Sequence, residues 1–146
     1  MKRFYLDSSF LVSLLFEGHE NNLKAKELLE NLLNDESGCI LLLGTLAVDE
    51  TWYSLYEHAD LETYNPFSTF ADTFKEKIDM FLSRPDVRLV SPIDNMWVLN
   101  KAIEGAKKFN LRPRDAFHYA MASEYKACIV AKDRDYLKTD LNFRQF

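Results

Sequence analysis

The sequence is poor in the features that mark secreted, disulfide-bonded and disordered proteins. It has two cysteines, Cys39 and Cys128, and neither is spaced from a second Cys or a His in a way that would bind zinc. Both lie in apolar runs, which predicts buried free thiols in a reducing compartment. Only four Gly and four Pro are present, so the composition excludes a long disordered segment.

Long apolar runs and an excess of positive charge are also missing. No apolar run approaches the length of a membrane-spanning helix, and the first residues lack the apolar core and cleavage site of a signal peptide. We therefore expect a cytoplasmic protein with no membrane contact. The formal net charge of -5 excludes a protein that coats nucleic acid by bulk electrostatic attraction, but it leaves room for a local basic rim around an acidic centre.

The sequence does contain a regular alternation of strand and helix patterns. With 146 residues, 47% of them hydrophobic, it is expected to form one domain over residues 1–146. Strands are predicted at 2–7, 39–43, 86–90, 128–131 and 141–146, helices at about 8–15, 25–33, 45–59, 67–81, 94–106 and 113–127, and a loop at 60–66. This alternation implies an α/β fold with a parallel sheet covered on both faces.

Four acidic residues are expected at one edge of this sheet. Asp7 and Asp133 lie where two predicted strands end, and Glu50 and Asp115 lie in early turns of predicted helices. In a parallel sheet these positions share the edge at which ligands bind. Carboxylates brought this close repel one another, so the arrangement favours a divalent metal, and oxygen ligands suit Mg²⁺ or Mn²⁺. A metal held there points to hydrolysis of a phosphodiester.

The sequence around these acids resembles the acidic motifs of PIN-domain ribonucleases, and of VapC-like toxins in particular. The matching blocks are Tyr-Leu-Asp-Ser-Ser at 5–9, Leu-Ala-Val-Asp-Glu-Thr at 46–51, Arg-Asp-Ala-Phe-His-Tyr-Ala at 114–120 and Ala-Lys-Asp-Arg-Asp-Tyr at 131–136. The resemblance covers essentially the whole chain and is most specific in the last two blocks. It implies a three-layer α/β/α sandwich with a central parallel sheet.

The same resemblance implies a function. It implies a Mg²⁺- or Mn²⁺-dependent endoribonuclease that cleaves RNA, often a homodimer, and the toxin of a type II toxin–antitoxin pair with an antitoxin protein as its partner. The implied catalytic and metal-binding residues are Asp7, Glu50, Asp115 and Asp133. Asp135 would be an auxiliary acid, and the candidate supporting residues are Ser8, Ser9 and Arg114.

One departure from the family pattern keeps an alternative open. Many members carry Thr or Ser two residues before the last conserved acid, where this chain has Ala131, so one hydrogen bond to that carboxylate or to a metal-bound water would be missing. The alternative is a catalytically weak PIN-like module that binds RNA or a protein without cutting. A second enzymatic alternative is a phosphatase that uses Asp7 as its nucleophile. Such enzymes carry an Asp-x-Asp pattern at the first strand, but the third position of that pattern is Ser9 here.

Several neighbouring residues permit a structural and a functional interpretation. His118 follows Asp115 by three residues, and a structural or ligand-supporting role is favoured for it. Basic residues flank the third and fourth acids and are interpreted either as RNA contacts or as solvated charges; these are Arg112, Arg114, Lys132 and Arg134. The aromatic residues Trp52, Tyr53 and Tyr56, with the apolar stripe from Phe67 to Phe81, indicate core packing or a dimer or antitoxin surface.

Overall fold

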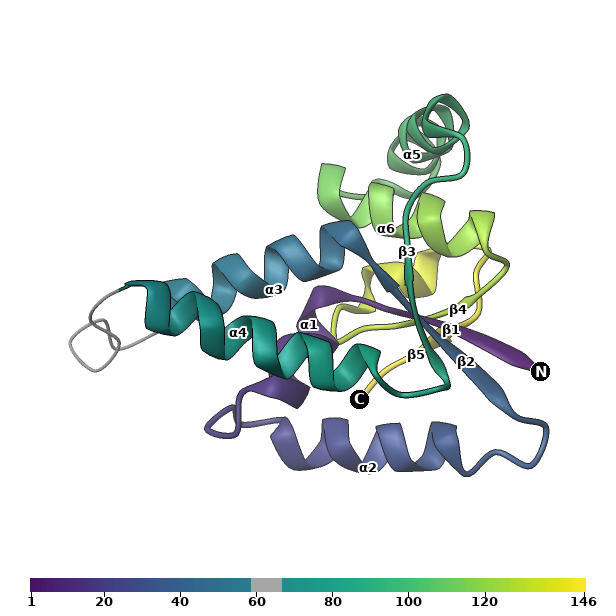
Figure 1. The fold of residues 1–146 in the computed structure, drawn as a ribbon. Helices are drawn as coiled ribbons and strands as arrows, with labels where there is room; N and C mark the ends of the chain where they lie inside the picture. The colour runs from purple at the N-terminus through teal and green to yellow at the C-terminus, as the bar shows by residue number, and fades with distance from the viewer. Residues whose placement is uncertain (59–66) are drawn as a thin grey trace.

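The computed structural model describes residues 1–58 and 67–146, in which strands and helices alternate as predicted (Figure 1). The strands are β1 (Lys2–Leu6), β2 (Cys39–Gly44), β3 (Val87–Val90), β4 (Cys128–Val130) and β5 (Phe143–Arg144). The helices are α1 (Ser8–Leu15), α2 (Asn22–Leu33), α3 (Thr45–His58), α4 (Phe67–Leu82), α5 (Asn95–Phe109), α6 (Pro113–Glu124) and the 3₁₀ helix η1 (Arg134–Lys138). The sequence did not predict η1, and the loop predicted at 60–66 lies outside the described residues.

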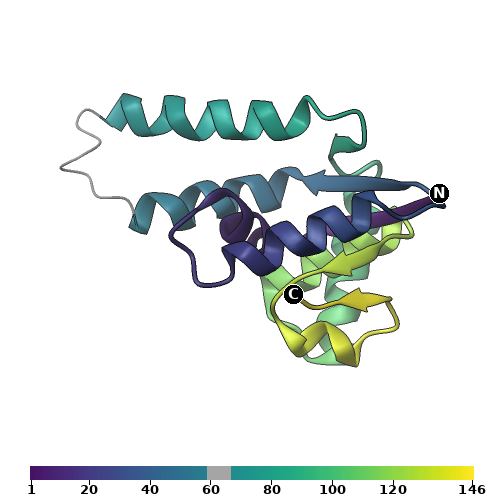
Figure 2. The ribbon, with the colours of Figure 1, turned by 90° about the horizontal axis from the view of Figure 1, so that it is seen from below.

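The strands form one parallel sheet in the order β3-β2-β1-β4-β5. Helices α5 and α6 cover one face of the sheet and α1 and α2 lie on the other (Figure 1, Figure 2). Helices α3 and α4 run side by side and extend past the sheet in both views. The predicted α/β/α sandwich is therefore confirmed.

The central strand β1 contributes to both hydrophobic cores because successive side chains of a strand point to opposite faces. Tyr5 packs in the core under α5 and α6 with residues such as Val98. Phe4 and Leu6 pack in the other core with residues such as Phe10 of α1. Burial on both faces explains why the last three residues of β1, Phe4 to Leu6, are all apolar, whereas Lys2 and Arg3 at its start are exposed.

Acidic residues cap the element starts at the carboxyl edge of the sheet. Asp7 follows β1 and caps α1, accepting a hydrogen bond from the Ser9 backbone N–H. Asp133 follows β4 and caps η1, accepting from the Asp135 backbone N–H at 2.8 Å. A cap of this kind satisfies a backbone N–H that the helix leaves unpaired. Each carboxylate therefore also stabilises the start of the helix that follows it.

The two cysteines correct one prediction from the sequence. Cys39 and Cys128 are free, as expected, but each is half-buried rather than fully buried. Both lie at the first position of a strand, where the sheet is only partly covered. Among the described helices, none has the length and apolarity that a membrane span requires.

Candidate functional site

Asp7 is fixed at the carboxyl end of β1 by contacts with β4 and with the start of α1. Its backbone N–H donates to the Val130 carbonyl at 3.0 Å, which ties it to the end of β4. Its carboxylate accepts from the Ser9 hydroxyl at 2.8 Å, and that hydroxyl in turn accepts from the Lys132 backbone N–H at 3.0 Å. Ser9 therefore joins the start of α1 to the segment that leaves β4.

Glu50 and His118 complete a buried group with Asp7. The Nε2 atom of His118 lies 2.7 Å from Glu50 Oε2 and 3.3 Å from Asp7 Oδ1. Glu50 is in the second turn of α3 and His118 is on α6, and their side chains are 9% and 1% exposed. The imidazole thus lies between two carboxylates that come from distant parts of the chain.

The pKa shifts of this group show how its charges balance. Burial opposes ionisation of Glu50, but the hydrogen bond and positive charge of His118, aided by Ser8 and Arg114, lower the Glu50 pKa below its ordinary value. Burial likewise opposes charging of His118, but the Glu50 hydrogen bond and the Asp7, Glu50 and Asp115 carboxylates raise its pKa. A protonated imidazole has no free lone pair, so in this state His118 holds the carboxylates in place instead of binding a metal itself.

The other ring nitrogen of His118 is held from beneath by Tyr5. The Tyr5 hydroxyl lies 3.1 Å from His118 Nδ1, and a charged imidazole would donate that hydrogen bond. Gly44, the last residue of β2, makes room for this hydroxyl. A Cβ atom at Gly44 would lie 2.9 Å from Tyr5 Cζ and still closer to the hydroxyl oxygen. A side chain at position 44 would therefore displace Tyr5 and disturb the imidazole above it.

A second acidic group gathers at the same edge of the sheet. Ligand oxygens of Asp115, Asp133 and Asp135 lie within 4.8 Å of one another. Asp115 is in the first turn of α6, and Asp135 pairs with Lys138 at 2.6 Å. Burial, followed by the charges of Asp133 and Asp7, raises the Asp115 pKa. Because Asp7 acts on Asp115, the two groups belong to one electrostatic unit.

The four acids singled out in the sequence thus divide between two adjoining groups. Asp7 and Glu50 lie with His118, and Asp115 and Asp133 lie with Asp135. The donor set is dominated by carboxylate oxygens, which fits Mg²⁺ or Mn²⁺ better than a softer metal. A supporting role was predicted for His118, but its contacts with both Asp7 and Glu50 were not. The available signal was its three-residue spacing from Asp115, which sets both on one face of a helix.

The candidate supporting residues differ in how they reach the acids. Ser9 binds Asp7, and Ser8 forms a side-chain hydrogen bond with Glu50. Arg114 is 69% exposed, and its Nε lies 3.5 Å from Glu50 Oε1. Ala131 is fully buried. The Ser9 hydroxyl gives the site a link between its strand ends that does not depend on a hydroxyl at position 131.

The hydroxyl of Tyr136 is buried without a hydrogen-bond partner among the described residues. An unsatisfied buried hydroxyl costs stability, so Tyr136→Phe is expected to raise the free energy of unfolding by about 1 kcal/mol. Denaturant unfolding of the metal-free protein measures the change. Tyr119→Phe is the matched control, because the Tyr119 hydroxyl donates to Asp140 at 2.9 Å and its loss should be destabilising. Equal destabilisation by both changes would show that the Tyr136 hydroxyl does have a partner.

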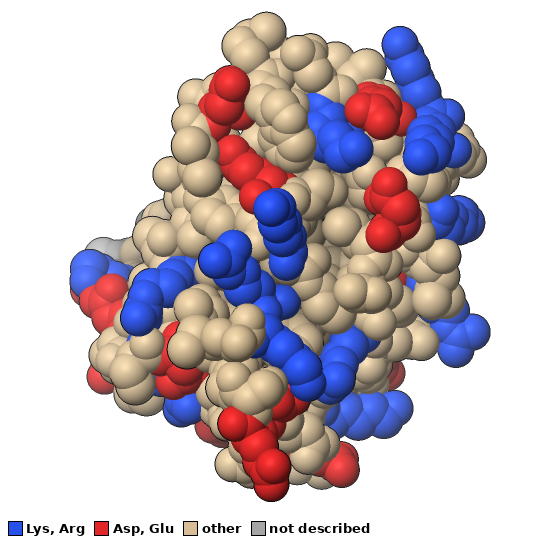
Figure 3. All heavy atoms as spheres, turned by 90° about the vertical axis from the view of Figure 1, so that its right-hand side faces the viewer, with Lys and Arg blue, Asp and Glu red and all other residues tan. Residues whose placement is uncertain are grey.

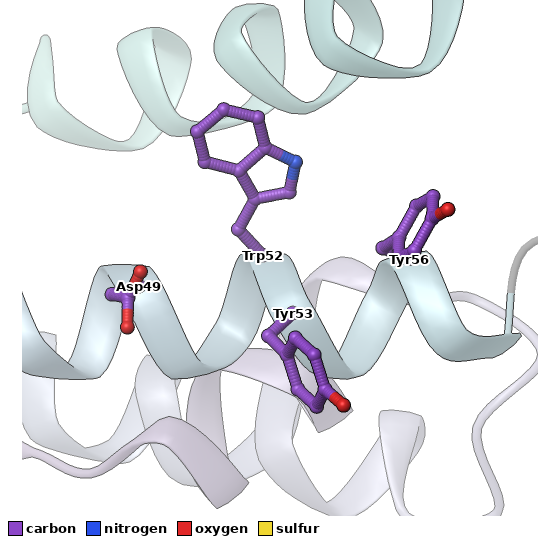
Figure 4. A pocket seen from close by; sticks show the side chains of 4 residues that line it. All are labelled: Asp49, Trp52, Tyr53 and Tyr56. Atoms are coloured by element: carbon purple, nitrogen blue, oxygen red, sulfur yellow. The ribbon is translucent and has the colours of Figure 1, made fainter. Parts of the chain in front are cut away.

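Exposed aromatic residues form a separate hollow on α3. Asp49, Trp52, Tyr53 and Tyr56 line a space of about 390 Å³ (Figure 4). Trp52 stacks on Phe74 of α4 with 5.5 Å between ring centroids, yet it remains 39% exposed. The sequence left core packing and a partner surface open for these residues, and the structure contains elements of both. On α4 the stripe from Phe70 to Phe81 is buried, while the Phe67 side chain lies outside the described residues.

Comparison with known proteins agrees with this geometry. A family model described as the PIN domain matches residues 4–142. A search of curated proteins finds no significant match. Three similar solved structures are VapBC2 of Rickettsia felis bound to a promoter DNA fragment, the sarcin-ricin-loop-cleaving toxin VapC20 of Mycobacterium tuberculosis and FitAcB of Neisseria gonorrhoeae.

The likeness to these structures extends over almost the full chain. The identities are 13%, 17% and 14%, with TM-scores of 0.68, 0.69 and 0.67 respectively. The matches cover 98%, 94% and 96% of this chain and 98%, 95% and 95% of the other chains. At such low identity the structures establish a shared fold, whereas the family model spans nearly every element that builds the acidic edge. The chain is therefore a member of the PIN domain family.

Proposed function

We propose that this protein is a metal-dependent endoribonuclease that hydrolyses RNA phosphodiester bonds. The observation that carries the proposal is the meeting of two acidic groups, Asp7 with Glu50 and Asp115 with Asp133 and Asp135, at one edge of a parallel sheet. So many carboxylates are costly to hold together unless a cation neutralises them. Acidic residues without a functional role are usually dispersed over the surface, where water screens their charges.

In this proposal Asp7, Glu50, Asp115 and Asp133 hold Mg²⁺ or Mn²⁺, and Asp135 assists. A bound ion of this kind polarises a phosphoryl oxygen and lowers the pKa of water so that it becomes a nucleophile. The protein's own contribution is to orient the ligands. His118 and Ser8 fix Glu50, Ser9 fixes Asp7, and the exposed guanidinium of Arg114 is available to an RNA phosphate.

We further propose that the protein is the toxin of a toxin–antitoxin pair. Two of the similar structures, those from R. felis and Salmonella typhimurium, are VapBC bound to DNA, and another from Klebsiella pneumoniae is a toxin–antitoxin complex. The exposed Trp52, Tyr53 and Tyr56 support a protein partner, because such aromatics are enriched in binding surfaces. Either an antitoxin or a second copy of this chain would use such a surface. A gene for a small DNA-binding protein next to this one would support the antitoxin.

Calorimetric titration with Mn²⁺ and an RNA cleavage assay together test the nuclease proposal. We expect saturable Mn²⁺ binding, a higher melting temperature with Mn²⁺, and cleavage of single-stranded RNA that EDTA stops. The physical reason is that the ion binds only where the folded chain assembles the carboxylates. Metal binding without cleavage would favour the alternative, a PIN-like module that binds without cutting. Absence of Mn²⁺ binding would contradict both the metal site and the nuclease.

A further inference from the structure

A second charged surface lies at the opposite, amino-terminal edge of the sheet. A hollow of about 700 Å³ lies there, and its lining includes four cationic residues and one amide beside apolar side chains and Cys128. The charged and amide residues are Lys2, Arg3, Lys126, Arg144 and Asn142. We call it the basic hollow. Lys2 and Arg3 begin β1, and Lys126 precedes β4, so parallel strands bring them to one edge although more than 120 residues separate them in sequence. Figure 3 shows Lys and Arg side chains gathered at the centre of the face that contains the N-terminus in Figure 1.

Most of the positive charge in the basic hollow is not neutralised. Lys2 pairs with Asp35 at 2.6 Å. Arg3 donates one hydrogen bond to the Tyr125 carbonyl, and Arg144 lies over the Phe4 ring at 5.5 Å, which leaves their charges unpaired. Within residues 1–58 and 67–146, no acidic residue lines the hollow and Lys126 has no ion pair. In a protein with a net charge of -5, unpaired cations gathered in one concave place form a local site for an anion.

A second hollow adjoins the basic hollow and adds an aromatic surface. This adjoining hollow of about 470 Å³ shares Lys126 and Asn142 with the first and is also lined by Trp97 and Lys101. Trp97 is 41% exposed. The one acid that lines the adjoining hollow is Asp140, which already accepts a hydrogen bond from the Tyr119 hydroxyl and lies 4.0 Å from Lys108. Cations along a groove with an exposed aromatic ring are the features that bind single-stranded nucleic acid, because phosphates meet the cations and bases stack on the ring.

We propose that the basic hollow and the adjoining hollow bind the sugar-phosphate backbone of single-stranded RNA outside the cleaved segment. This inference rests on the proposed ribonuclease function for the choice of RNA. Strand β1 has five residues, and four steps of about 3.3 Å place its two ends roughly 13 Å apart. A longer RNA can therefore place phosphates at both edges of the sheet. A trinucleotide has only two internucleotide phosphates, and both are taken up at the acidic edge where one of them is cleaved.

RNA binding in EDTA tests this surface separately from catalysis. Without metal the acidic edge repels phosphate and cannot cleave, so fluorescence anisotropy of a labelled 20-nucleotide RNA reports binding elsewhere. We expect Lys126→Asn with Arg144→Gln to weaken binding about 5- to 10-fold and to reduce the slope of log K against log salt by about 1.4, or about 0.7 per lost phosphate contact. Asparagine suits position 126 because Lys126 has a φ of 51°, in the left-handed region.

Two further variants control for charge and for folding. Lys24→Gln with Lys26→Gln removes the same two charges from exposed positions of α2 that line neither hollow, and it should change affinity less than about 2-fold. Arg3→Gln removes a single exposed guanidinium and should lower the slope by about 0.7. Circular dichroism shows whether each variant is folded.

Specific outcomes would overturn the inference. Equal loss in the two double variants would mean that only net charge matters, and no loss in Lys126→Asn with Arg144→Gln and in Arg3→Gln would mean that RNA does not bind there. Displacement of the RNA by polyglutamate at equal charge concentration would assign the surface to acidic protein segments instead. Mn²⁺-dependent cleavage of a trinucleotide should stay unchanged in the double variant at 126 and 144. If wild type cleaves no RNA, the proposed nuclease fails while the EDTA binding result still stands on its own.

Discussion

Asp7→Asn is expected to abolish Mn²⁺-dependent RNA cleavage while the protein stays folded. Asparagine keeps the shape of the side chain and caps a helix as well as aspartate does, so α1 should retain its start. It removes the negative charge that binds the ion. Loss of a residue that merely supports a metal ligand costs about 10- to 100-fold, so loss of a ligand should cost at least about 100-fold in kcat/KM. Initial rates on a fluorescent RNA with Mn²⁺ measure the effect.

Asp115→Asn should show the same loss of cleavage, and it should also change the stability of the metal-free protein. Burial and the charges of Asp133 and Asp7 raise the pKa of Asp115, which means that its ionised form is disfavoured in the folded state. Removing that charge should therefore raise the melting temperature in EDTA even as cleavage disappears. Mn²⁺ should raise the melting temperature of the wild type far more than that of the variant.

Asp49→Asn is the matched control for both variants. Asp49 precedes Glu50 on α3 but faces the aromatic hollow, so the same chemical change occurs away from the acidic groups. Its cleavage rate and Mn²⁺ binding should equal those of the wild type. Cleavage that persists in Asp7→Asn and Asp115→Asn would remove the acidic edge from the reaction, and equal loss in Asp49→Asn would point to a general charge effect.

The placement of the acids was predictable because it follows from chain topology. Asp7 directly follows β1 and Asp133 lies three residues past β4, and a parallel sheet brings such positions to one edge whatever the details of packing. The position of Asp115 was equally predictable, because Pro113 marks the start of α6. These inferences need only the order and direction of the elements, which hydrophobic patterns in the sequence report.

The division of the acids into two groups was not predictable, because it depends on side-chain packing. Glu50 turns inward to meet His118, and that meeting depends on the space that Gly44 leaves for Tyr5. No local pattern encodes a contact between residues 44 and 5, or between 50 and 118. The basic hollow was not predicted for the same reason. From the sequence, positive charge was expected only beside the acidic edge, where Arg114 and Lys132 lie.

His118→Ala is expected to lower the free energy of unfolding of the metal-free protein by about 3–5 kcal/mol, the usual cost of removing one partner from a buried ion pair. The change leaves Glu50 and Asp7 buried without the cation between them, and it leaves the Tyr5 hydroxyl without its partner. Urea unfolding in EDTA at pH 6 measures the loss. His118→Gln should cost less, since an amide still donates a hydrogen bond to Glu50.

The pH dependence of stability gives this prediction a second readout. The folded-state pKa of His118 lies above its ordinary value of 6.5, so its stabilising contribution is complete below about pH 6.5 and is lost as the pH rises through the folded pKa. The free energy of unfolding of the wild type in EDTA should therefore fall as the pH rises from about 6.5 through the folded-state pKa of His118. His118→Ala should not show this fall. His58→Ala removes an exposed histidine of α3 whose Nδ1 lies 2.7 Å from the Ser54 carbonyl, away from the acidic groups, and the variant should unfold like the wild type at each pH. If His118→Ala behaves like His58→Ala, the imidazole does not hold the carboxylates together, and another group must neutralise them in the absence of metal.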